Sequence, residues 1–275
     1  MLAVITAIFG LLGLSLGSFL NLCIDRLPGG KSIVNPGSHC DSCGQSLKAI
    51  DLVPLFSYLW LRGRCRRCGV RIPFRLPLVE LATGAIFALL AWHFGLGLVL
   101  ALALIYAAIF ILILVIDLEQ GLVLNVVLLP GAAIALVSSF LWHGFGDHWP
   151  ALGPGFALSA LLGGVAGVVL LLLPYLISRG GMGEGDVKLA GLIGMVAGFP
   201  QVFLALLLGI VGGGLVASFL LLSGMKKRKD PIPFGPFLAV GAMAVLVWGQ
   251  GIIEWYRHSL VYIAFSHQLS AISRF

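Results

Sequence analysis

Long apolar runs with few charges recur eight times in this chain of 275 residues and constrain its fold more than any other feature. A helix that crosses a bilayer needs roughly 20 apolar residues, and most of the runs come close to that length or exceed it. One run is short, so the sequence predicts about eight transmembrane helices. In chain order the runs are Leu2–Ile24, Leu78–Phe94, Leu96–Ile116, Leu122–Trp142, Phe156–Ile177, Val187–Ala197, Val202–Leu222 and Ile232–Ile253.

The composition excludes the other common classes of protein. The chain is 60% apolar and 10% charged, whereas a soluble domain is about 45–50% apolar and about 25% charged. Disorder needs low hydrophobicity together with high charge. No charge precedes the first run and no small-residue cleavage site follows it, so we expect a retained anchor rather than a removed signal peptide. The sequence therefore predicts an all-α polytopic membrane protein.

The basic residues predict the orientation of these helices. With eight spans, every Lys and Arg except Arg257 and Arg274 falls on one side, many of them in the polar segment 25–77. Lys and Arg gather on the cytoplasmic side of membrane proteins, so that side is cytoplasmic and the N-terminus lies outside. Membrane topology also accounts for the net charge of +6, and we expect no nucleic-acid partner. After the last run, residues 254–275 have the composition of an interfacial helix.

Four of the five cysteines form two pairs in the polar segment after the first run. The pairs are Cys40 with Cys43 and Cys65 with Cys68, and 21 residues separate them. A two-residue gap lets both thiolates of a pair bind one ion, and two pairs complete a tetrahedral zinc site with no open position for catalysis. Disulfides are disfavoured in the cytoplasm, so we predict a small zinc-binding loop with a structural Zn²⁺. Redox chemistry is the alternative, because Arg64, Arg66 and Arg67 would lower the thiol pKa values. His39 could replace one of the cysteine ligands, although an incidental surface histidine is the simpler interpretation.

Two aspartates from different runs lie at the same predicted membrane depth. Asp117 ends the third run, and Asp186 follows the glycine-rich stretch 180–185 and opens the sixth. Ionisable groups in spanning helices are costly and indicate function. Two close carboxylates share a proton, so one can accept a proton from water while the other polarises a peptide carbonyl, as in aspartic proteases. From topology alone, an equally good interpretation is two interfacial carboxylates that cap helices or pair with Lys188 and Arg179.

The glycine-rich stretch resembles a known motif. Gly183, Gly185 and Asp186, followed by Lys188, resemble the GxGD motif of the type IV prepilin peptidases. The region after Asp117 is similar to that family as well, except that Leu124 and Asn125 stand where a proline and an acid are usual. We expect this departure to alter the start of a helix rather than the chemistry.

The resemblance covers most of the chain. The stretches 17–21 and 26–28, the paired cysteines, residues 75–80 and the stretch 233–236 resemble successive family blocks. The resemblance implies a catalytic pair, Asp117 and Asp186, an active-site loop with Gly183, Gly185 and Lys188, and zinc ligands Cys40, Cys43, Cys65 and Cys68. It also implies the domain boundaries: a first transmembrane helix at 1–24, a cytoplasmic zinc-binding segment at 25–77, an aspartic peptidase membrane core at 78–253 and an interfacial tail at 254–275.

The family resemblance implies two activities in the bacterial inner membrane. The first is removal of the basic leader of type IV prepilins or type II secretion pseudopilins at the cytoplasmic face. The second is methylation of the new N-terminus with S-adenosylmethionine, for which Asn21, Arg26 and Glu80 are candidates on the resemblance alone. No glycine-rich Rossmann fingerprint supports a cofactor site, and a structural ion pair of Glu80 with Arg75 or Arg71 is an equal alternative.

Two other functions are compatible with parts of the sequence. A non-enzymatic scaffold of a pilus or secretion system would use the zinc loop for docking and would tolerate changes at either aspartate. A transporter would use membrane carboxylates as a proton relay. Transporter sites usually lie near the midplane, whereas both aspartates are predicted at the cytoplasmic ends of their helices.

Overall fold

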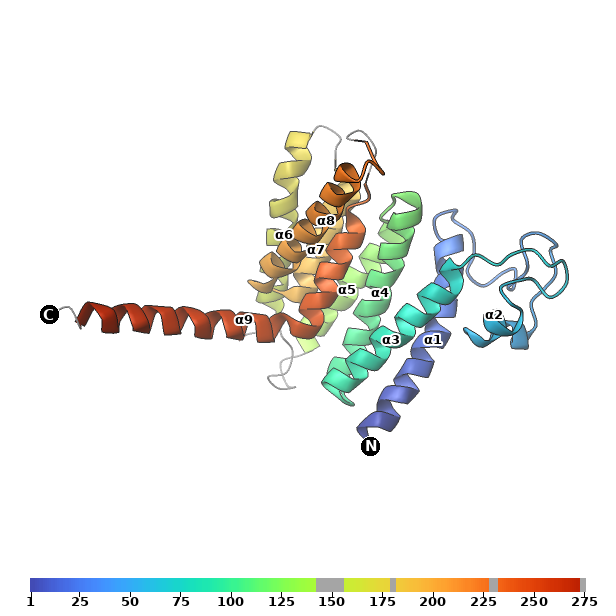
Figure 1. Ribbon diagram of the computed structural model, residues 1–275, viewed down its shortest axis with the longest axis horizontal. Helices are drawn as coiled ribbons and strands as arrows, with labels where there is room; N and C mark the ends of the chain where they lie inside the picture. The colour runs from blue at the N-terminus through green and yellow to red at the C-terminus, as the bar shows by residue number, and fades with distance from the viewer. Residues whose placement is uncertain (142–155, 179–181, 228–231, 273–275) are drawn as a thin grey trace. The chain divides into compact units, whose positions relative to one another are not determined.

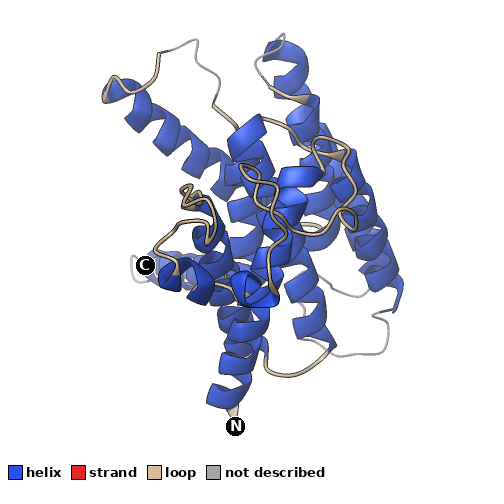
Figure 2. Cartoon of the chain, turned by 90° about the vertical axis from the view of Figure 1, so that its right-hand side faces the viewer, coloured by secondary structure: helices blue, strands red, loops and turns tan. Residues whose placement is uncertain are grey.

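The computed structural model describes residues 1–141, 156–178, 182–227 and 232–272, and within these ranges the chain is helical without a β-strand (Figures 1 and 2). Each of the eight apolar runs corresponds to one helix, as predicted. The helices are α1 (Leu2–Arg26), α2 (Phe56–Trp60), α3 (Arg75–Phe94), α4 (Leu98–Gln120), α5 (Asn125–Leu141), α6 (Phe156–Ser178), α7 (Glu184–Ala197), α8 (Gln201–Leu222) and α9 (Gly235–Ile272), with a 3-10 turn η1 (Ala49–Leu52).

Five of these helices are long and apolar enough to cross a membrane: α1, α3, α4, α6 and α8. Two more, α5 and α9, carry shorter apolar stretches at Asn125–Phe140 and Gly235–Gly249. The short sixth run forms α7, which has 14 residues. The tail predicted at 254–275 begins inside α9, which continues to Ile272. Arg179 and Arg274 lie outside the described residues.

The chain divides into two compact units. Unit 1 comprises residues Met1–Gly131 together with Pro231–Ala239, and unit 2 comprises Ala132–Asp230 with Val240–Phe275. In unit 1, α1 packs along α3, and α4 contacts both. In unit 2, α6, α7 and α8 pack against one another. Unit 1 is discontinuous in the sequence, because its second stretch contains the start of α9.

Small residues allow the helices of each unit to approach closely. A Cβ at Gly17 of α1 would lie 2.7 Å from the Cα of Glu80 in α3. In unit 2, a Cβ at Gly163 of α6 would collide with the carbonyl oxygen of Gly194 in α7. Membrane helices associate through such small-residue contacts, because lipid supplies no hydrophobic force between them.

The helix after Asp117 begins normally despite the departure from the family pattern. The carbonyl of Leu124 accepts hydrogen bonds from the N–H groups of Val127 and Leu128, at 3.0 and 3.1 Å. Leu124 therefore provides the first hydrogen bonds of α5 without the usual proline.

Candidate functional site

The four paired cysteines converge on one point in unit 1. Their Sγ atoms all lie within 4.8 Å of one another, and the Sγ atoms of Cys40 and Cys68 are 3.8 Å apart. A tetrahedral zinc–thiolate site with bonds of about 2.3 Å has sulfur–sulfur edges of about 3.8 Å. The cluster therefore could hold one metal ion with four thiolate ligands, and the convergence of the two pairs that the spacing predicts is confirmed. His39 is not part of it: its Nδ1 lies 2.9 Å from the carbonyl oxygen of Gly37.

The two cysteine pairs have the same backbone frame. The N–H of Cys40 bonds to the carbonyl of Gln45, and the N–H of Cys65 bonds to the carbonyl of Val70. An isolated antiparallel bridge closes each loop, between His39 and Ser46 and between Arg64 and Arg71. Gly44 and Gly69 turn the chain at the same place in each loop with φ of 66° and 71°, which glycine adopts without strain.

Backbone N–H groups, rather than the arginine side chains, lower the pKa of the Cys65 thiol. The N–H groups of Cys68 and Arg67 lower the pKa of Cys65 to about 6. At Cys68, the Val70 amide lowers the pKa, but desolvation and hydrogen bonds with the neighbouring sulfurs outweigh it and raise the pKa to about 11. The arginine side chains bond elsewhere: Arg66 pairs with Asp51 at 2.7 Å, and Arg67 donates to the side chain of Gln45.

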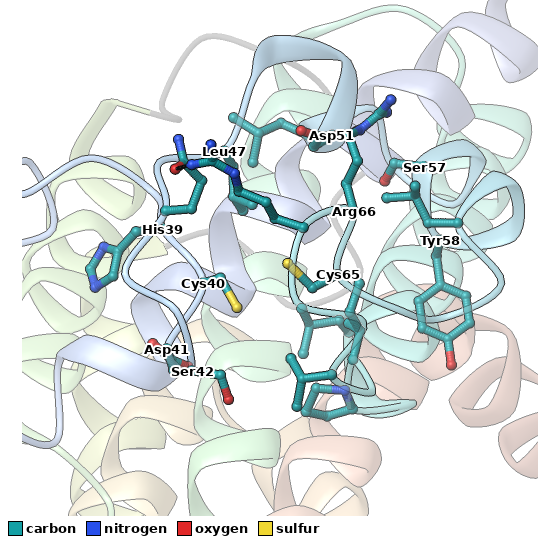
Figure 3. A pocket seen from close by; sticks show the side chains of 18 of the residues that line it. His39, Cys40, Asp41, Ser42, Leu47, Asp51, Ser57, Tyr58, Cys65 and Arg66 are labelled. Carbon is teal, nitrogen blue, oxygen red and sulfur yellow. Dashed lines mark hydrogen bonds and ion pairs between the residues drawn. The ribbon is translucent and has the colours of Figure 1, made fainter.

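A cavity of about 570 Å³ opens beside the cysteines, between the polar segment and the adjoining parts of α1 and α3. Figure 3 shows Ser57 and Tyr58 of α2 on one side of it and Cys40 with Cys65 on another. Ser18 of α1 and Glu80 of α3 also line it. The backbone N–H of Leu55 donates to Oε2 of Glu80 at 2.8 Å and so attaches the polar segment to α3.

The three candidates for the methyl-donor site have different surroundings. Glu80 lines the cavity. Asn21 donates to the carbonyl of Leu76 at 2.9 Å, and Oδ1 of Asn21 is buried without a hydrogen-bond partner. Arg26 donates to the carbonyls of Ser32 and Gly37, at 2.9 and 3.4 Å, and so closes the loop that follows α1.

An arginine ties together the ends of three helices of unit 1. Arg75, the first residue of α3, pairs with Asp25 of α1 at 2.6 Å and with Glu119 of α4 at 2.8 Å. Glu80 accepts its hydrogen bond from Leu55, so the structure gives Arg75 different acidic partners from the one considered in the sequence analysis.

Asp117 lies in the last turn of α4 and is 4% exposed. Its Oδ2 atom is buried without a hydrogen-bond partner, while the backbone N–H of Gly235 bonds to the carboxyl group. Gly121 ends the helix in the left-handed conformation and bonds back to the Asp117 carbonyl at 2.9 Å. A carboxyl group buried at the negative end of a helix is costly, which favours a functional role.

Asp186 lies in the first turn of α7 and is buried. Gly183 caps this helix, and a Cβ at Gly183 would lie 3.6 Å from Oδ2 of Asp186. The glycine therefore leaves the space beside the carboxylate free. Gly185 precedes Asp186 in the same turn, and Lys188 pairs with Glu184 at 2.8 Å.

The structure brings together the four cysteines and places Glu80 in the adjoining cavity. Asp117 belongs to unit 1 and Asp186 to unit 2, so their meeting in one site stays a prediction. Sequence reasoning missed Ser18, Ser57 and Tyr58 as cavity residues. Their positions depend on how the polar segment folds back on α1, and no local motif encodes that fold.

Two protein-family models match this chain. The bacterial peptidase A24 N-terminal domain matches residues 11–94, and the type IV leader peptidase family matches residues 104–218. Together they cover both the polar segment and the two aspartates.

Three full-length relatives carry the same name, prepilin leader peptidase/N-methyltransferase. The protein from Bacillus subtilis is 34% identical over 91% of this chain and 97% of its own length. The proteins from Aeromonas salmonicida and Pseudomonas aeruginosa are each 31% identical, over 91% and 90% of this chain and 93% and 91% of their own lengths. No solved structure matches the chain. With both models in order and identity above 30% over nine-tenths of its length, this multi-pass membrane protein belongs to the type IV leader peptidase family.

Proposed function

We propose that this protein is an aspartic endopeptidase that removes the basic leader of type IV prepilins or type II secretion pseudopilins, and that it then methylates the new N-terminal residue. The main structural support is the state of Asp117, a buried carboxyl group with an unpartnered oxygen in the last turn of an apolar helix. The relatives' shared name supports both activities.

In this mechanism Asp117 and Asp186 act together on the peptide bond that follows the leader. One carboxylate accepts a proton from water, the water oxygen adds to the peptide carbonyl carbon, and the protonated partner donates to the carbonyl oxygen. Collapse of the tetrahedral intermediate breaks the carbon–nitrogen bond, and the leaving amine takes a proton. Gly183 leaves room for substrate backbone beside Asp186. Both aspartates and the zinc segment face the cytoplasm of a bacterial inner membrane, where the basic leader stays.

Mass spectrometry of a prepilin incubated with the purified protein tests the peptidase. We expect loss of the leader with the unchanged protein and no cleavage with Asp117→Asn or Asp186→Asn. Glu119→Gln is the matched control, because Glu119 is two residues from Asp117 but half-exposed and paired with Arg75. A folded, zinc-loaded protein that leaves several prepilins uncut would refute the peptidase and favour the scaffold.

Cys40, Cys43, Cys65 and Cys68 would hold one structural Zn²⁺. Four thiolates fill a tetrahedral site, so the ion would stabilise the fold of the polar segment rather than act on substrate. Metal analysis of the purified protein should find one zinc per chain.

The cavity beside the zinc site fits a methyl donor such as S-adenosylmethionine. Ligand sites have volumes of about 300–1,000 Å³, and this one has about 570 Å³. Its lining includes acidic groups, hydroxyls, the ring of Tyr58 and the basic side chains of Lys48, Arg66, Arg67 and Arg71. The acidic group of Glu80 suits the positive charge and the ribose diol of such a ligand, and the basic groups suit its carboxylate. Bound there, the donor would supply the methyl group, while Glu80 and the hydroxyls of Ser18 and Ser57 would orient it.

Binding of S-adenosylhomocysteine, measured by equilibrium dialysis, tests this cavity independently of methylation. We expect Glu80→Ala to weaken binding at least tenfold and Glu119→Ala to leave it unchanged. Equal binding by both variants, with zinc retained, would remove the cavity from the proposal but would not affect the peptidase.

A further inference from the structure

The short helix α2 exposes apolar residues and turns polar residues inward, which is the reverse of what a helix in water does. Its outward residues Phe56, Leu59 and Trp60 are 56%, 73% and 71% exposed. These three residues, here called the α2 apolar face, are spaced as i, i+3 and i+4 and so share one side of the helix. The polar residues Ser57 and Tyr58, which lie between them in the sequence, line the cavity (Figure 3).

Apolar residues that precede α2 are exposed as well. Ile50 and Val53 are 56% and 41% exposed, whereas Leu52 lines the cavity. The rings of Phe56 and Trp60 stack at 5.9 Å between centroids, so the face is ordered rather than a set of independent side chains. Exposed apolar side chains grouped on one face of a helix indicate an apolar partner.

One hydrogen bond and one shared cavity indicate the depth of α2 relative to the spanning helices. Leu55 bonds to Glu80, which lies five residues inside α3, or about 7.5 Å along the helix at 1.5 Å per residue. Ser18 lines the same cavity as Ser57 and lies eight residues before the end of α1, or about 12 Å. The segment 55–60 therefore lies alongside the last turns of α1 and the first turns of α3 rather than beyond them.

That depth corresponds to the boundary between lipid headgroups and acyl chains. Because α1 and α3 are both long and apolar enough to span a membrane, their ends at Arg26 and Arg75 mark the edge of the bilayer. An interfacial helix buries its apolar face about 5–10 Å into that boundary, where tryptophan is enriched. The chain leaves α2 toward Arg62 and Arg64, which are exposed and suited to anionic headgroups.

We propose that the α2 apolar face inserts into the leaflet at the Arg26 and Arg75 end of the membrane. The lipid holds the outer wall of the cavity against the bilayer, while Ser57 and Tyr58 face inward. The polar segment is then anchored at three places: α1, α3 and the leaflet surface at α2.

Photo-crosslinking in vesicles of phosphatidylethanolamine and phosphatidylglycerol tests this insertion. p-Benzoylphenylalanine is placed at Leu59 or at Trp60, and in the control at Asn35, which is exposed in the loop between α1 and the first cysteine pair. Zinc content and prepilin cleavage verify that each protein is folded. We expect lipid adducts, identified by mass spectrometry, at 59 and 60, and only background at 35.

Three results would overturn the proposal. Absence of lipid adducts at 59 and 60 in a folded protein would show that lipid does not cover the face. Adducts at 35 in equal yield would show that the whole segment contacts lipid without a specific role for α2. A crosslink from 59 or 60 to a second copy of the chain would assign the face to self-association.

Discussion

The contact between Gly17 and Glu80 gives a prediction whose size follows from the packing of α1 on α3. A Cβ at Gly17 would lie 2.7 Å from the Cα of Glu80, whereas carbon atoms pack best at about 3.5–4.0 Å. The obstacle is backbone rather than the end of a flexible side chain, so the helices themselves must separate. Overpacking of this kind costs about 1–3 kcal/mol.

Gly10 of α1 provides a matched control for the change Gly17→Ala. A Cβ at Gly10 would lie 3.5 Å from the Cβ of Ala88 in α3, an ordinary contact. Both changes carry the same helix-propensity gain of about 1 kcal/mol, which cancels in the comparison. Gly17→Ala should therefore be about 1–3 kcal/mol less stable than Gly10→Ala.

Unfolding of the two variants by a denaturing detergent in mixed micelles measures this difference. We also expect Gly17→Ala to weaken S-adenosylhomocysteine binding while zinc content stays at one ion per chain, because the separation moves Glu80 but not the cysteines. Equal stability of the two variants would refute the packing argument. Equal ligand binding together with unequal stability would show that Glu80 does not depend on this contact.

Three further predictions concern other parts of the structure. Cys40→Ser should remove the zinc, measured by metal analysis, whereas Cys23→Ser should retain it because Cys23 is buried in α1 away from the cluster. In metal-free protein at pH 7, Cys65 should react with iodoacetamide before Cys68, because its lowered pKa makes Cys65 a thiolate first. The rate of the Cys65 reaction should rise through about pH 6. Peptide mass spectrometry that found Cys68 modified first would contradict this prediction. Arg75→Gln should lower stability by about 0.4–2 kcal/mol in the same unfolding assay, because two partly exposed ion pairs are lost at about 0.2–1 kcal/mol each. An unchanged midpoint would show that the pairs contribute nothing.

The sequence predicted those features that depend on local pattern. Eight apolar runs became eight helices, because a run of apolar residues in a bilayer must satisfy its backbone internally. The two CxxC pairs predicted the cysteine cluster, since a two-residue gap and a following glycine determine the shape of each loop. The ends of the apolar runs also predicted correctly that Asp117 and Asp186 lie at the ends of their helices.

The features that the sequence did not predict depend on contacts between distant residues. The sequence suggests Arg75 as one ion-pair partner of Glu80, whereas in the structure Arg75 bonds to Asp25 and Glu119. Charge alone cannot select among several acids near one helix end, because the choice depends on how α1, α3 and α4 pack. The cavity was missed for the same reason: Ser18 and Tyr58 are 40 positions apart and share no motif.

The discontinuity of unit 1 limits how this protein can be divided. Asp117 is hydrogen-bonded by the backbone of Gly235, which lies more than a hundred positions later, in the stretch Pro231–Ala239 that returns to unit 1 between the two stretches of unit 2. A fragment that stops before residue 231 would contain every cysteine and both aspartates and yet lack part of the enclosure of one of them. If the two parts of the chain were expressed separately, the surroundings of Asp117 would form only when the later part supplied its segment to the earlier part. Truncation series and domain fusions with this protein are best designed around α9 rather than around the family boundaries.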